Sequence, residues 1–235
     1  MFAIYKRELR SYFTTAVGYV FLAVIVALSA VAFSLTTILQ ATNDVTTYFT
    51  VLLFILMVAL PVLTMKLFSE ERKMRTEQQL LTAPVSIAKI VAAKFFAAFT
   101  VFFGANLLCS LAYITLFIYS EPEGGIILGN IIAITLVGAS FIAVGIFVSS
   151  LTENQLAAAI GTFGILLAML GVGLLSAVIP WYPVRYVLGW FSILTRYSNF
   201  TNGFFDFAAL FYYASVCFIF LFLTCRVLER RRYSA

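Results

Sequence analysis

The sequence contains no histidine and little charge of either sign. Of its 235 residues, only 11% are aspartate, glutamate, lysine or arginine. Without histidine the chain lacks the usual general base and the commonest nitrogen ligand of zinc, so few routes to hydrolytic chemistry are left. A soluble domain of this length needs more charge to cover its surface. The sequence therefore predicts no catalytic residue, no metal site and no cofactor held by this chain.

Paired cysteines and a phosphate-binding loop are also missing. Cys109, Cys217 and Cys225 lie in apolar segments without paired spacing, which favours small buried side chains over metal or redox roles. No glycine directly precedes a lysine, so the GxxxxGK[ST] loop cannot be present. No polar segment is long enough to form a nucleotide-binding domain. We therefore expect that this chain is not an enzyme, and that any ATP hydrolysis occurs in a separate subunit.

Long apolar runs are what the chain has in excess. Hydrophobic residues make up 63% of the sequence, and the mean hydropathy is +1.05. A run of about 20 apolar residues crosses the hydrocarbon core as a helix, and continuous runs favour helices over a barrel. Residues 1–235 therefore predict one all-α integral membrane domain with six spans, at about 16–39, 47–67, 91–119, 126–149, 157–180 and 208–227.

Lysine and arginine are distributed unequally between the two sides of this arrangement. With the N-terminus inside, 13 of the 15 basic residues lie on the inner side, and only Arg185 and Arg196 lie outside. The positive-inside rule therefore predicts a multi-pass protein of the cell membrane with both termini in the cytoplasm. The positive inner face suits anionic membrane lipids and requires no nucleic acid.

Residues 1–15 predict an amphipathic helix lying in the inner membrane interface. One face is apolar and carries Phe2, Tyr5, Leu9 and Tyr12. The other face is charged and carries Lys6, Arg7, Glu8 and Arg10. A cleaved signal peptide is the alternative, but the apolar run that follows extends to Leu39 and is too long for a typical signal core.

Residues 68–86 form the one densely charged stretch inside the chain, FSEERKMRTEQQLLTAPVS. Residues 69–81 predict a short helix with Glu70 and Glu71 at its positive end. Pro84 would end this helix, and Ser86 is placed to cap the next one. Such a loop suits contact with a soluble partner. A solvated hairpin anchored by lysines is the alternative.

This stretch resembles the first cytoplasmic loop of the type-two ATP-binding-cassette permeases, where E-E-R-x-x-x-T-x-E/Q-x-L-L-x-x-P-V-S recurs. The matching residues are Glu70, Glu71, Arg72, Thr76, Glu77, Leu80, Leu81, Pro84, Val85 and Ser86, followed by the basic Lys94. In that family the loop contains the coupling helix, which sits in a cleft of the ATPase subunit. The resemblance implies that these residues, together with Arg75, couple the chain to an ATPase.

Two further stretches extend the resemblance. Residues 149–159 resemble the family's second cytoplasmic loop, particularly in the gliding-motility and nitrous-oxide-reductase-maturation branch, and supply the candidates Thr152, Glu153, Asn154 and Gln155. Phe200, Gly203 and Asp206 resemble that branch's motif before the last span, although Arg196 and Tyr197 replace its His-Phe pair.

The resemblance implies a particular assembly and activity. It implies a prokaryotic exporter in which two permease subunits, identical or paralogous, bind two copies of a cytoplasmic ATPase that holds ATP and magnesium. An accessory membrane protein is a further possible partner. Two alternatives from other classes stay open: a membrane scaffold that recruits an ATPase without transport, and an intramembrane hydrolase suggested by the EExxxR pattern at residues 70–75.

The membrane spans offer several candidates for packing, path or gate. A stripe of small residues at helical spacing predicts close helix packing, within the chain or between subunits: Gly161, Gly164, Ala168 and Gly171. Pro61 predicts a kink near a gate, and Asn106 either borders a substrate path or bonds another helix. The aromatic residues of 181–207 predict segments at the outer membrane interface. The resemblance implies short re-entrant helices there, with Tyr186 and Trp190 as gate candidates; lipid anchoring alone is the alternative.

Overall fold

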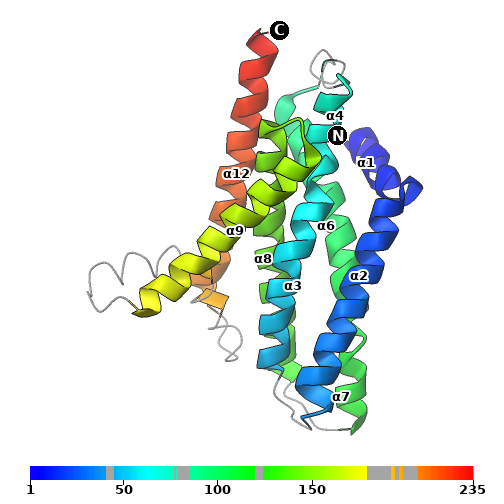
Figure 1. Cartoon of the computed structure of the whole chain (residues 1–235), viewed down its shortest axis with the longest axis vertical. Coiled ribbons are helices and arrows are strands. Elements are labelled where there is room, and N and C mark those ends of the chain that lie inside the picture. Colours follow the sequence, from blue (N-terminus) through cyan, green and yellow to red (C-terminus); the bar gives the residue numbers. More distant parts are fainter. Residues whose placement is uncertain are drawn as a thin grey trace.

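A computed structural model describes residues 1–40, 45–76, 78, 85–119, 124–178, 192–193, 196–197 and 206–234. In this part of the chain the regular elements are all helical, which confirms the predicted all-α class (Figure 1). Six helical segments are long and apolar enough to span a membrane, as predicted: Ala16–Ile38, Thr46–Lys73, Ile87–Ile118, Gly124–Leu151, Gln155–Gly173 and Phe207–Arg232.

The helices follow one another with few interruptions. They are α1 (Phe2–Thr14), α2 (Ala16–Phe33) with its π-helical extension η1 (Ser34–Ile38), α3 (Thr46–Thr64), α4 (Lys66–Lys73), α6 (Ile87–Ser110), α7 (Tyr113–Tyr119), α8 (Gly124–Leu151), α9 (Gln155–Val178) and α12 (Phe207–Ser234). Helix α4 continues the direction of α3, and α7 continues α6 (Figure 1).

Helix α8 is the centre of the bundle, because it is the most buried of the six spans in the described part of the chain. It contacts α3, α6, α9 and α12. Two glycines permit the closest approaches: a Cβ atom on Gly138 would overlap the ring of Phe102 in α6, and one on Gly145 would overlap the hydroxyl of Thr64 in α3. Glycine at these positions therefore sets how tightly the bundle closes around α8.

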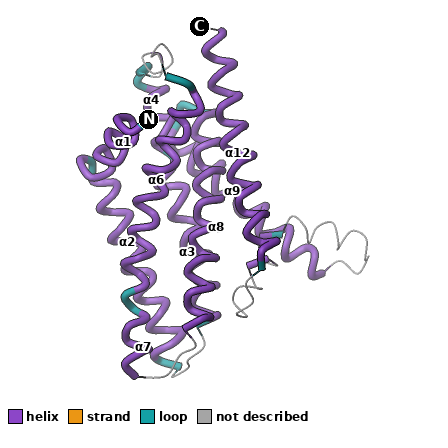
Figure 2. The backbone as a smooth tube through the Cα atoms, turned by 180° about the vertical axis from the view of Figure 1, so that it is seen from behind, coloured by secondary structure: helices purple, strands orange, loops and turns teal. Residues whose placement is uncertain are grey.

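Both termini lie at the same end of the bundle, together with α1, α4 and the turn between α8 and α9 (Figures 1 and 2). We call this the charged end. At the opposite end, four aromatic rings pack with their centroids 5.3–6.2 Å apart: Phe33, Tyr48, Phe49 and Tyr113. They join the C-terminal end of α2 to α3 and α7. The hydroxyl groups of Ser29 and Tyr48 are 2.7 Å apart in the same region. The two ends therefore differ in kind, one aromatic and one ionic.

Candidate functional site at the charged end

The charged loop begins at a break between α3 and α4. Thr64 ends α3 and Lys66 begins α4, so Met65 alone separates the two helices. Pro61 lies inside the last turn of α3, where it removes one backbone donor and loosens the ladder. Four residues later Met65 separates the two helices, although its backbone stays in the right-handed helical region, and the predicted kink stays a prediction.

Ser149, near the end of α8, fills this break. Its Oγ accepts hydrogen bonds from the backbone N–H groups of Phe68 at 3.1 Å and Ser69 at 3.2 Å, and donates one to the carbonyl of Met65 at 3.0 Å. The Ser69 hydroxyl also donates to the Met65 carbonyl. Ser149 is fully buried, so these bonds replace missing helical bonds where water cannot. One side chain of α8 therefore fixes the start of α4.

A second contact joins α4 to the turn between α8 and α9. Arg72 donates from Nε to Glu153 Oε1 at 2.8 Å and from Nη1 to the carbonyl of Leu151 at 2.9 Å. From α12, Arg231 Nη2 donates to the carbonyl of Ser150 at 2.6 Å. The structure thus brings together the two loops that the sequence identified separately.

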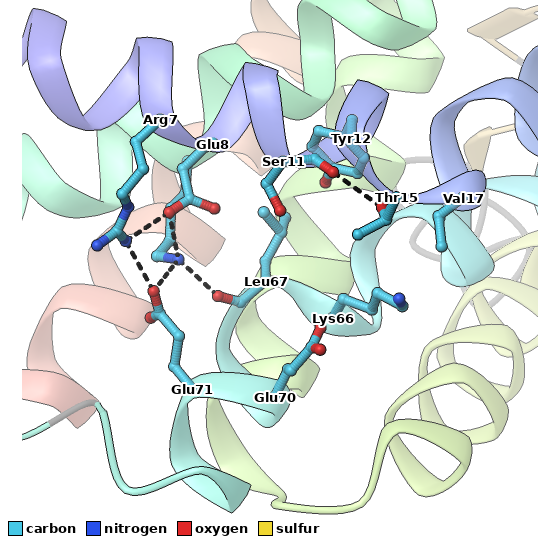
Figure 3. Close-up of a pocket in the computed structure, with 11 residues that line it drawn as sticks. Arg7, Glu8, Ser11, Tyr12, Thr15, Val17, Lys66, Leu67, Glu70 and Glu71 are labelled. Atoms are coloured by element: carbon cyan, nitrogen blue, oxygen red, sulfur yellow. Dashed lines mark hydrogen bonds and ion pairs between the residues drawn. The ribbon is translucent and has the colours of Figure 1, made fainter.

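The third contact is an ionic cluster centred on Lys94 of α6 (Figure 3). Lys94 Nζ lies 2.9 Å from Glu71 Oε1 in α4 and 3.2 Å from Glu8 Oε1 in α1. It also donates to the carbonyl of Leu67 at 2.7 Å and lies 5.0 Å from the centre of the Phe68 ring. Because Lys94 is 0% exposed, its charge depends entirely on these partners.

Arg7 completes the cluster from the solvent side. Its Nη2 lies 2.6 Å from Glu8 Oε1 and 2.9 Å from Glu71 Oε1. Two cations and two carboxylates therefore face one another, and their formal charges cancel. Since the four side chains come from α1, α4 and α6, the cluster ties the N-terminal helix to the charged loop.

Helix α1 packs Tyr12 against the bundle, with Tyr5 and Leu9 partly buried, and it adds one carboxylate to this packed face. Glu8 was expected on the solvent side, but it is 9% exposed, while Phe2 of the predicted apolar face is 76% exposed. Tyr12 is buried, and its hydroxyl donates to the carbonyl of Leu63 at 3.2 Å. Burial raises the pKa of the Tyr12 phenol, so it stays protonated and remains a donor. The packed face of α1 is thus partly ionic because the buried Lys94 requires an anion.

The helix predicted over residues 69–81 is not continuous, because residues 74–76 form a turn; of residues 77–81, the structure describes only Gln78, which is helical. Helix α4 starts earlier, at Lys66, and ends at Lys73. The turn that ends it is a Schellman motif, in which Thr76 N–H bonds the Glu71 carbonyl at 2.9 Å and Arg75 N–H bonds the Arg72 carbonyl at 3.1 Å. Arg75 adopts the left-handed conformation, with φ of 57°, in the position that glycine usually occupies. This helix end could not be predicted, because the glycine that usually marks it is absent.

The second loop is short and rigid. Asn154 caps α9, since its Oδ1 accepts the N–H of Leu156 at 3.0 Å and its carbonyl accepts the N–H of Ala158 at 2.9 Å. Thr152 Oγ1 accepts the N–H of Asn154 at 3.1 Å, and Gln155 begins the helix. Of the candidates in this loop, Glu153 is therefore the one that contacts the first loop.

Two candidates of the membrane spans are placed by their contacts. Asn106 Nδ2 donates a hydrogen bond to Thr135 Oγ1 at 3.0 Å and so joins α6 to α8. This contact is the helix-to-helix bond that was predicted as one of two roles for Asn106. In the stripe on α9, a Cβ atom on Gly161 would meet Val148 of α8 at 3.1 Å, whereas one on Gly164 would meet nothing within 4 Å. The residues that the structure describes thus cover only part of the stripe. Six candidates lie outside the described residues: Glu77, Leu80, Leu81, Pro84, Tyr186 and Trp190.

Sequence reasoning missed the partners that hold α4. Lys94 was identified only as a basic residue following the loop, and Ser149 only as part of the second-loop resemblance. For Glu8 a signal existed, because it lies three residues after Tyr5 and four before Tyr12, on the same helical face. For Ser149 the sequence offers no signal, since its partners are backbone atoms 80 residues away.

The structure is that of a multi-pass helical membrane protein. It has six helices that can span a membrane, and a charged end that contains both termini and two loops. The sequence model of the family described as ABC-2 family transporter protein matches residues 6–171. This match covers most of the chain, including the ionic cluster and both loops, so the chain belongs to the ABC-2 family. It is a permease subunit of the kind that works with an ABC ATPase and is not itself the ATPase. No curated protein gives a significant match to the sequence.

Proposed function

We propose that the chain is the membrane half of an exporter and that the first loop, from Glu70 onward, docks a cytoplasmic ATPase. This proposal rests on the contacts of α4, whose inner side is bonded to α1, α6 and α8. The last residue of α4 and the two that follow it are exposed: Lys73, Met74 and Arg75. A short element that is held firmly on one side and open on the other is suited to receive force from a soluble subunit.

The contacts of α4 support transmission by rigid-body motion. Ser149 links α4 to the central helix α8, and Lys94 links it to α6 and α1. A displacement of α4 therefore moves three helices together, because buried ionic and hydrogen-bonded contacts have few alternative arrangements. We propose that ATP and magnesium, bound by two ATPase copies, close those subunits and tilt the bundles by this route.

Association with the ATPase tests the docking proposal. We expect the double variant Met74→Asp/Arg75→Glu to lower co-purification with the ATPase encoded beside this chain, because both side chains are exposed and hold no other helix. The matched control is Lys89→Glu, which reverses an exposed charge at the start of α6. Unchanged association of the double variant would contradict docking at this loop, and association without substrate-dependent transport would favour the scaffold alternative.

We propose further that two copies, identical or paralogous, form the path. The uncovered part of the small-residue stripe supports this: Gly164 and Ala168 are exposed on α9, which diverges from the bundle in both views (Figures 1 and 2). Small residues let two helices approach closely in lipid. Ala168→Trp is therefore expected to shift the purified complex from two permease subunits to one, as measured by its mass. The exposed Phe218→Trp is the control, and an unchanged mass would exclude the stripe as the interface.

The remaining details of the assembly are proposals that rest on the family and the charge distribution. The excess of lysine and arginine at the charged end supports a cytoplasmic location for both termini, in the membrane of a prokaryotic cell. An accessory membrane protein and the gliding-motility and nitrous-oxide-reductase-maturation branch stay predictions. The hydrolase alternative is less well supported, because Glu71 Oε1 faces Arg7 and Lys94 and so acts as a structural anion.

A further inference from the structure

A pocket of about 260 Å³ lies between α1 and α4, beside the ionic cluster (Figure 3). Its polar lining outside the cluster consists of Ser11, Thr15, Lys66 and Glu70. The pocket sits where the membrane helices meet the charged end, since Thr15 marks the turn into α2 and Lys66 the start of α4. This is the level at which a span meets the polar headgroups of a bilayer.

Two charges in this pocket are left without partners. Arg7, Lys94 and their carboxylates neutralise one another. By contrast, among the residues that the structure describes, the side chains of Lys66 and Glu70 form no hydrogen bond or ion pair. They lie four residues apart on α4, hence on the same face. The pocket therefore offers one free cation and one free anion a short distance apart.

An apolar groove of about 590 Å³ adjoins the pocket. It runs between α2 and α3, and its lining consists of apolar side chains: Ala16, Val17, Val20, Phe21, Val24, Leu28, Val51, Phe54, Ile55, Val58, Ala59, Val62 and Met65. Val17 lines both the groove and the polar pocket, and Met65 of the groove precedes Lys66 of the pocket. The size lies within the range of about 300–1,000 Å³ that ligand pockets occupy.

We propose that the pocket and groove together bind one phospholipid with a phosphoethanolamine headgroup. Lys66 pairs with the phosphate and Glu70 with the ammonium group, while an acyl chain lies in the groove between α2 and α3. A polar pocket continuous with an apolar groove at the membrane interface matches the two halves of a phospholipid. The cation and anion together favour a zwitterionic headgroup with a hydrogen-bonding ammonium over an anionic one, because Glu70 attracts the ammonium group and has no positive partner in an anionic headgroup.

The site does not depend on the proposed coupling to an ATPase, and its test uses the full chain alone. The purified protein is mixed with phosphatidylethanolamine, phosphatidylcholine or phosphatidylglycerol, and bound lipid is counted by native mass spectrometry. We expect phosphatidylethanolamine to be retained preferentially. We expect Lys66→Gln and Glu70→Gln each to lower this retention about fivefold, the size of effect that one charge has near a membrane surface.

Matched variants separate this site from general lipid contact. Lys89→Gln removes an exposed charge outside the pocket and should leave retention unchanged. Val58→Trp fills the groove and should lower it, whereas Leu107→Trp, at an exposed position on α6, should not. Three results would each overturn the proposal. The three lipids could be retained equally, Lys66→Gln and Lys89→Gln could have equal effects, or Val58→Trp could lose subunit pairing instead of lipid.

Discussion

Replacing Lys94 with methionine is expected to destabilise the folded bundle by about 3–5 kcal/mol, the usual cost of removing one partner from a buried ion pair. Methionine has a similar length, so the change removes the charge more than the volume. It leaves Glu8 and Glu71 facing each other with only Arg7 between them, and it leaves the Leu67 carbonyl without its donor. The midpoint of thermal denaturation, measured on the purified protein in detergent, should fall sharply.

A second substitution distinguishes the charge from the packing. Lys94→Met/Glu71→Gln removes one cation and one anion, so Arg7 and Glu8 remain as a balanced pair. This double variant is expected to be more stable than Lys94→Met alone, which is the sign of a direct coupling. Lys89→Met, an exposed position on the same helix, should leave the midpoint unchanged. A double variant less stable than the single one would show that the charge is not the reason Lys94 matters.

Ser149→Ala is expected to uncouple ATP hydrolysis from transport while leaving the six helices in place. The change leaves the N–H groups of Phe68 and Ser69 without the Ser149 acceptor, while the Met65 carbonyl keeps the Ser69 hydroxyl as a donor. Each buried polar group left unpaired costs about 1–3 kcal/mol, and here the cost falls on the start of α4. In the reconstituted complex, we expect substrate transport per ATP hydrolysed to fall severalfold.

The neighbouring serine provides the control. Ser150 is equally buried, but its hydroxyl donates only within its own helix, to the Phe147 carbonyl at 2.6 Å. Ser150→Ala should therefore keep transport coupled to hydrolysis, because the link from α8 to α4 is intact. If both variants lose transport to the same degree, the effect comes from general loosening of α8 and the assigned role of Ser149 is wrong.

The membrane helices could be predicted from the sequence because lipid leaves few choices. Continuous apolar runs must form helices whose backbone groups pair internally, so the six runs correspond to the six spans, although their ends differ by up to seven residues in the described part of the chain. For α1, the sequence identified the packed apolar residues Tyr5, Leu9 and Tyr12, but not that Glu8 is buried beside them. Glu8 pairs with Lys94, a lysine 86 residues later whose burial no local pattern reveals.

The first loop shows what resemblance can and cannot supply. It placed Glu71 and Arg72 in the right loop, but both side chains hold the loop to the rest of the protein through Lys94 and Glu153. Substituting them would disturb the bundle as well as any docking. Met74 and Arg75 are better probes because their side chains are exposed. The distinction requires side-chain contacts between distant segments, which a sequence pattern does not contain.

We propose that the exposed residues at the end of α4 contact an ATPase subunit. Site-specific photocrosslinking detects such a contact. A photoreactive residue at position 74, where the side chain is 68% exposed, would be incorporated into the complex in lipid. We predict an adduct with the ATPase whose yield changes on ATP binding, and no such adduct from position 107, which is 50% exposed on α6. An ATPase that co-purifies but forms no adduct at position 74 would contradict the account.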